Sequence, residues 1–116
     1  MMPPSEFFSL LSDETRLRCL VLLLKEKELC VCELGEVIRS HQPKISRHLA
    51  LLRKSGIVTD KRRGQWVYYR INPDLRIWVM NTLKAVFKEL KDGEPFHSDL
   101  ERLQLVRQKQ LCKTGK

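Results

Sequence analysis

Apolar residues recur at helical spacing through the first part of the chain. A short apolar segment covers residues 5–11, and Ser12-Asp13-Glu14-Thr15 then supplies a helix cap followed by acidic residues. The sequence therefore predicts a helix that begins near Asp13. From Leu17 onward this helix is apolar on most of its faces, which is typical of a buried core element.

Two shorter helices separated by a tight turn are predicted next. The first covers residues 33–39 and is apolar on one side. The second begins near Pro43, because proline fits the first turn of a helix without loss of a hydrogen bond, and it continues to Ser55-Gly56. The expected inward stripe of the second helix consists of Ile45, Leu49 and Leu52. Its opposite side is polar and basic.

Two β-rich runs follow at residues 57–59 and 66–71, and the basic segment at residues 61–65 lies between them. This pattern predicts a β-hairpin with a basic tip. Two helices, a turn and a hairpin in this order predict a winged helix-turn-helix, a mostly α fold with a β-hairpin wing (α+β).

A long amphipathic helix is predicted after a turn at residues 72–74. Its apolar stripe is larger than a small core needs, so we expect this helix and the segment at residues 5–11 to form a dimer interface. Residues 1–92 are then expected to form the DNA-binding and dimerisation domain. Residues 93–116 are expected to form a basic C-terminal tail that is either a loosely docked helix or mobile. The stripe consists of Leu75, Trp78, Val79, Leu83, Val86, Phe87 and Leu90.

The excess positive charge lies in one segment. The chain of 116 residues has a formal net charge of +8, and residues 39–70, with nine basic residues and one acidic residue, carry the same excess. Such a concentration favours a phosphate-binding surface over an ordinary solvated face. No apolar run approaches the roughly 20 residues of a membrane span. The first residues do not resemble a secretory signal, so we expect a cytoplasmic protein without a membrane partner.

Candidate contacts with double-stranded DNA lie in the second short helix and in the hairpin. Basic and amide side chains read base edges and phosphates, and a wing places its cations against the backbone or in the minor groove. The alternative is that these charges only keep the surface soluble, and that the histidine is a bystander. The candidates are Gln42, Lys44, Ser46, Arg47, His48, Arg62 and Arg63.

The four cysteines of the chain have different sequence settings. Cys30 and Cys32 are a close pair, and in a reducing compartment such a pair is a candidate for metal binding or redox chemistry. Cys19 falls within the predicted buried helix, where a small core residue is expected. Cys112 falls in the tail.

Four ordered stretches of the chain resemble the ArsR/SmtB metalloregulators, and among these the arsenical-resistance operon repressors. The stretches are Leu11-Ser12-Asp13-Glu14-Thr15-Arg16-Leu17-Arg18, Glu28-Leu29-Cys30-Val31-Cys32-Glu33-Leu34, residues 42–53 (QPKISRHLALLR) and Gly64-Gln65-Trp66-Val67-Tyr68-Tyr69-Arg70. The resemblance implies a homodimeric repressor that needs no cofactor. It is expected to leave its operator when As(III) or Sb(III) binds the thiolates of Cys30 and Cys32.

The chain departs from some of these relatives at the position three residues after the pair, where they carry a third cysteine and this chain has Gly35. Cys112 is then a possible third ligand, and a free tail thiol is the alternative. On a regular helix residues i and i+2 point about 200° apart. Chelation by Cys30 and Cys32 is therefore expected to distort or unwind the start of their helix and move the reading helix out of register with DNA.

Other functions remain open. A cadmium, lead or zinc sensor on the same scaffold is one, although the predicted long helix lacks the histidines that zinc sensors of the family use. A repressor that responds to thiol oxidation is another, and a winged helix that binds only proteins is a third. An enzyme is not expected, since no catalytic triad, Gly-rich phosphate loop or HExxH helix is present.

Overall fold

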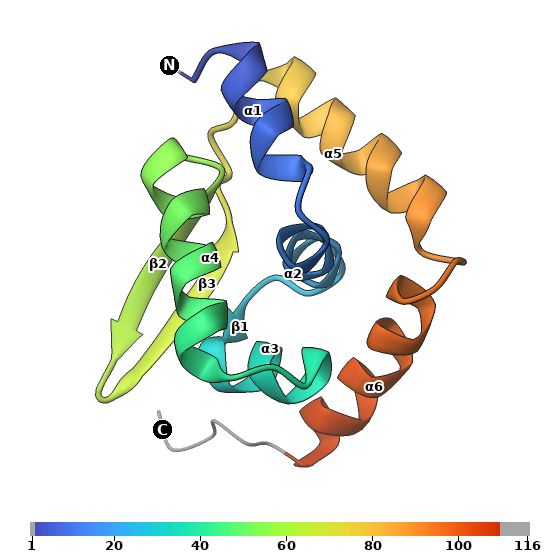
Figure 1. Cartoon of the computed structure of the whole chain (residues 1–116). Coiled ribbons are helices and arrows are strands. Elements are labelled where there is room, and N and C mark those ends of the chain that lie inside the picture. The colour runs from blue at the N-terminus through green and yellow to red at the C-terminus, as the bar shows by residue number, and fades with distance from the viewer. Residues whose placement is uncertain (1, 110–116) are drawn as a thin grey trace.

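The computed structural model describes residues 2–109, and Figure 1 shows the arrangement of its helices and strands. The elements are α1 (Pro4–Leu11), α2 (Glu14–Lys25), β1 (Leu29–Cys30), α3 (Val31–Ile38), α4 (Gln42–Ser55), β2 (Val58–Arg63), β3 (Trp66–Ile71), α5 (Ile77–Leu90) and α6 (Phe96–Lys109). The fold is thus helix-rich with a small sheet, as predicted. No helix within the described residues is long and apolar enough to cross a membrane.

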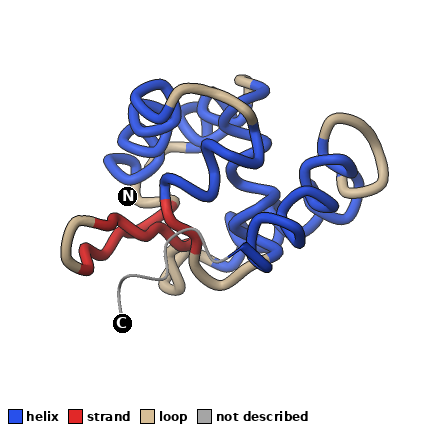
Figure 2. The backbone as a smooth tube through the Cα atoms, turned by 90° about the horizontal axis from the view of Figure 1, so that it is seen from below, coloured by secondary structure: helices blue, strands red, loops and turns tan. Residues whose placement is uncertain are grey.

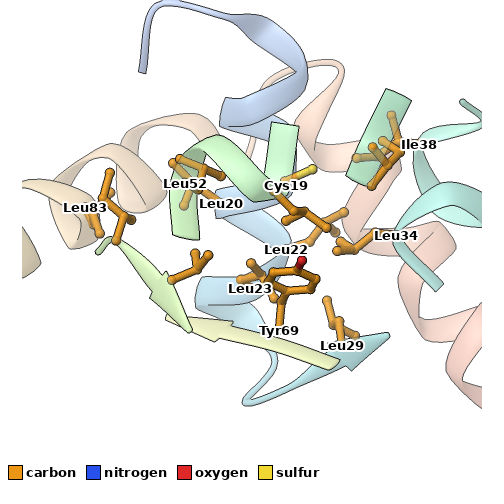
Figure 3. Close-up of a cluster of buried hydrophobic side chains, with 14 of the residues drawn as sticks. Cys19, Leu20, Leu22, Leu23, Leu29, Leu34, Ile38, Leu52, Tyr69 and Leu83 are labelled. Carbon is orange, nitrogen blue, oxygen red and sulfur yellow. The ribbon is translucent and has the colours of Figure 1, made fainter. Parts of the chain in front are cut away.

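Helix α2 is the centre of the core. The Asp13 side chain accepts a hydrogen bond from the backbone N–H of Arg16 at 3.0 Å, so the helix begins where the capping pattern predicts. Residues 19–23 are all buried, and the other helices surround α2, which is seen end-on in Figure 1. Figure 3 shows Cys19 among the core side chains, which confirms it as a buried residue.

Helices α3 and α4 form the helix-turn-helix. Arg39 ends α3 in the left-handed region at φ 61°, and Pro43 lies in the first turn of α4. The turn is tight because Gly35 has no side chain: a Cβ there would lie 3.3 Å from Gln42 Cγ and 3.4 Å from the carbonyl oxygen of Ser40. Gly56, at φ 92°, ends α4 where the sequence predicts.

The sheet has three antiparallel strands in the order β1-β3-β2, and the hairpin extends from the helical body in Figure 2. Strand β2 is longer than predicted and includes Arg62 and Arg63, so only Gly64 and Gln65 form the turn. Strand β1 was not predicted. It pairs Leu29 with Tyr69 and Cys30 with Tyr68, and two residues are too few to give a strand pattern.

Helices α1 and α5 pack side by side at the top of Figure 1. The ring centroids of Phe7 and Trp78 are 5.3 Å apart in an edge-on arrangement. Of the predicted α5 stripe only Val79 and Leu83 are buried. Ile77 and Phe8 are 78% and 54% exposed, so an apolar surface remains uncovered in the single chain.

Helix α6 packs against α2 and α3, beside α3 in Figure 1. Its residues Leu103 and Val106 are 1% and 2% exposed, so the helix buries its apolar face against the core. The division of the chain at residue 92 stays a prediction.

Candidate DNA-binding surface and sulfur pair

Helix α4 separates its apolar and polar residues cleanly. Ile45, Leu49 and Leu52 face the core, as predicted. Near its N-terminus the side chains of Gln42, Lys44 and Arg47 are exposed and Ser46 is half-buried. A helix that is anchored on one side and basic on the other can lie in the major groove with its N-terminal residues on base edges.

The cations on this surface have no acidic partners. The side chains of Lys44 and Arg47 on α4, and of Arg62 on β2, form no hydrogen bond or ion pair with any residue of the described range 2–109. By contrast, Arg53 at the other end of α4 binds Asp60 with a 3.1 Å distance between Nη1 and Oδ2. Unpaired surface cations lose no ion pair when they bind phosphates.

His48 lies on the inner flank of α4, toward α2. Its Nδ1 atom is 3.2 Å from Nη1 of Arg16 and 3.8 Å from Oδ2 of Asp13. Burial lowers the pKa of His48, and the charge of Asp13 opposes that shift. The ring therefore connects two helices, and a contact of His48 with DNA stays a prediction.

The two wing arginines have different surroundings. Arg62 is exposed, whereas Arg63 forms a two-point ion pair with Glu28, with distances of 2.8 Å and 3.1 Å between nitrogen and oxygen. The Arg63 guanidinium also lies 4.7 Å from the centroid of the Tyr68 ring. Arg63 thus joins the wing to the residue that precedes β1.

Cys30 and Cys32 lie at the junction of β1 and α3, with their sulfur atoms 2.8 Å apart. The expectation that both belong to one regular helix was wrong. Cys30 is the N-cap residue of α3 with extended backbone angles, φ −77° and ψ 150°, and only Cys32 is helical. Because the extended residue turns its side chain toward that of Cys32, one ion can contact both sulfurs without unwinding of α3.

The Cys30 side chain caps α3. Its sulfur lies 3.4 Å from the backbone nitrogen of Cys32 and accepts that hydrogen bond, while the Glu33 carboxylate accepts the N–H of Cys30 at 2.8 Å. Burial raises the pKa of the Cys30 thiol, and the hydrogen bond from Cys32 opposes this. The sequence interpretation missed Glu33, although an acid three residues after an N-cap is the signal of a capping box.

Of the two remaining cysteines, the structure describes Cys19. Burial raises the pKa of Cys19 to about 12, which keeps it a neutral thiol in the core. Cys112 lies outside the described residues. Within residues 2–109, no group of three or more His, Cys, Asp or Glu side chains is placed to hold a metal ion.

Comparisons with known proteins agree on one family. The family model described as "Bacterial regulatory protein, arsR family" matches residues 13–60. The arsenic resistance transcriptional regulator ArsR2 of Pseudomonas putida is 51% identical over 88 residues, which are 76% of each chain. The arsenical resistance operon repressor of Escherichia coli is 45% identical over 85 residues, which are 73% of each chain.

A similar solved structure is that of the AntR antimony-specific transcriptional repressor. Its TM-score is 0.63 at 27% identity, and the alignment covers 76% of this chain and 77% of that one. Fold and sequence therefore lead to the same conclusion: the chain belongs to the ArsR family of bacterial regulatory proteins and is a helix-turn-helix transcriptional repressor, not an enzyme.

Proposed function

We propose that this repressor binds operator DNA as a homodimer and dissociates when As(III) or Sb(III) binds Cys30 and Cys32. The observation that carries the proposal is the adjacency of the two sulfur atoms, 2.8 Å apart, at the start of a helix that packs against the reading helix α4. Two similar proteins, an arsenic resistance regulator and an antimony-specific repressor, support this choice of effector.

In the reduced protein, the binding chemistry uses the thiols of Cys30 and Cys32 and needs no oxidant. Two S–As bonds form as two As–OH bonds of arsenous acid break, and each thiol proton leaves with a hydroxide as water. Soft As(III) and Sb(III) favour sulfur ligands. Cys112 is the proposed third ligand, because this chain has Gly35 where some relatives have a third cysteine.

The DNA-binding role is proposed for the exposed N-terminal part of α4 and for the wing. Gln42, Lys44, Ser46 and Arg47 would enter the major groove, and Arg62 would lie against the backbone. We place His48 and Arg63 at the edge of this surface, where their contacts with Arg16 and Glu28 hold α4 and the wing in position.

The dimer is proposed to form through α1 and α5. Phe8 and Ile77 are exposed there, next to the packed pair Phe7 and Trp78. A two-fold dimer would present two reading helices to successive major grooves of a palindromic operator.

The coupling between the two sites would run through α3. The Cys30 sulfur caps α3 by accepting the N–H of Cys32, and a sulfur that bonds to the ion would weaken this cap. The start of α3 would then readjust, and α3 packs on α4 at the Gly35 contact. A small shift of α4 in each protomer would move both reading helices out of register with their grooves.

The test is fluorescence anisotropy of the labelled upstream promoter duplex with the reduced protein. Arsenite should release the wild type and leave the Cys30→Ser/Cys32→Ser variant bound, with Cys19→Ala, which lies in the core outside the proposed site, as the matched cysteine control. Release by cadmium, zinc or peroxide but not by arsenite would contradict the proposed effector. Failure of the wild type to bind the duplex at low salt would contradict the DNA-binding role.

A further inference from the structure

Arg107 of α6 contacts the chain on both sides of Cys30. Its Nη1 atom donates to the carbonyl oxygen of Glu28 at 3.1 Å, two residues before Cys30. The same nitrogen lies 3.3 Å from Oε2 and 3.4 Å from Oε1 of Glu33, three residues after Cys30. One guanidinium from a distant part of the sequence thus bridges the segment that contains the sulfur pair.

Glu33 passes this contact on to Cys30. Its side chain is only 7% exposed, and its Oε1 atom accepts the N–H of Cys30 at 2.8 Å. A buried carboxylate needs a cation or several hydrogen bonds to stay in place. Without Arg107, Glu33 would turn toward water, and the Cys30 peptide would lose its hydrogen bond.

A second arginine of α6 contacts α3 at the C-terminal end of α3. Arg102 Nε donates to the carbonyl oxygen of Val37 at 2.7 Å, in the last turn of α3. Arg102 and Arg18 also bind the fully buried Asp99, with distances of 3.2 Å and 2.7 Å. The two α6 arginines are a natural matched pair, because both fix α6 to α3 but only Arg107 lies beside the sulfurs.

We propose that Arg107 is a positioning residue for the effector response. It acts through Glu33 and the Glu28 carbonyl to hold the backbone on both sides of Cys30, so that the two sulfurs are preorganised for one ion. A preorganised site binds more tightly because the ligand does not have to order it. This inference rests on the proposed function and adds α6 to the sensor site.

The first experiment measures the dissociation constant of arsenite for the reduced full chain. Arg107→Ala should raise it roughly 2- to 30-fold, the range of couplings carried by residues that do not touch the ligand. Arg102→Ala should leave the dissociation constant within about twofold of the wild-type value. It should lower thermal stability at least as much as Arg107→Ala does. Arg107→Lys should be intermediate, because an ammonium keeps the charge beside Glu33 but not the bridging geometry.

The second experiment is hydrogen exchange of the Cys30 amide without arsenite. Arg107→Ala should accelerate it on the order of tenfold relative to wild type, and Arg102→Ala should not. An unchanged arsenite affinity in Arg107→Ala, or an equal loss in Arg102→Ala, would overturn the proposal. If wild type fails to bind arsenite, the proposed effector is wrong, and the exchange measurement still decides whether Arg107 positions Cys30.

Discussion

Two arginine-rich regions of this molecule differ in what surrounds their charges. On the α4 and wing surface, Lys44, Arg47 and Arg62 have no acidic partner within the described residues. On the α6 side, Arg102 and Arg107 bind acids and carbonyl oxygens of neighbouring elements. Cations of the first kind are available to a polyanion, and cations of the second kind hold helices together.

The difference shows that net charge alone does not locate a DNA site. A guanidinium carries the same charge in both regions, but only an unpaired one can neutralise phosphate without breaking an existing contact. Four experiments test this distinction, beginning with the one expected to have the largest effect.

Asp99→Ala should be the most damaging change for stability. The carboxylate is fully buried between Arg18 and Arg102, so its loss leaves both guanidiniums without their partner and loosens α6. We expect a fall of about 2–4 kcal/mol in the free energy of unfolding. Urea unfolding measures it, with the exposed Glu101→Ala as the control. A loss as small as that of the control would mean that the paired region does not hold the fold.

Lys44→Ala/Arg47→Ala should weaken DNA binding and leave stability nearly unchanged. We expect DNA affinity at low salt to fall roughly 10- to 100-fold, with a shallower dependence of log K on log salt. Urea unfolding should show little change, since neither side chain holds another element. Lys88→Ala/Lys109→Ala removes the same charge elsewhere and serves as the matched control in an anisotropy titration. Equal losses in both variants would remove any special role of the α4 surface.

Arg62→Ala and Arg63→Ala compare an unpaired and a paired cation within one strand. Arg62→Ala should reduce the salt slope by about 1 and weaken DNA binding a few-fold. Arg63→Ala should affect DNA less, because its guanidinium already binds Glu28. Salt titrations of DNA affinity for the two variants test this comparison. A larger loss of affinity in Arg63→Ala would show that Arg63 leaves Glu28 to bind the DNA.

His48 should give the smallest effect, seen as a pH dependence of stability. Burial lowers its pKa below the ordinary value of 6.5, so below that pH the unfolded chain binds more protons than the folded one. The free energy of unfolding should therefore fall as pH decreases below 6.5, and His48→Gln should lose this component. Urea unfolding at pH 7.5 and pH 5.5 tests it. Identical pH dependence in both proteins would show that His48 is not held between Arg16 and Asp13.

Much of the fold follows from local sequence patterns. The cap at Asp13, the helix start at Pro43 and the helix end at Gly56 act within a single turn of the chain, so their positions were predicted correctly. The predicted tip of the hairpin was too long. Basic residues have low β propensity, so Lys61–Arg63 did not look like a strand, but they pair with β3 across the hairpin.

The sequence by itself determined the buried helix α2, the helix-turn-helix, the wing and the cysteine pair, because each depends on residues close together in the chain. Only the tertiary structure decided that Cys30 ends a strand, that Arg63 binds Glu28 and that Arg107 contacts Glu33. The two arginine contacts join positions 35 and 74 residues apart, and the place of Cys30 depends on strand pairing with β3. No periodicity encodes them, since a long side chain finds its partner only after the helices have packed.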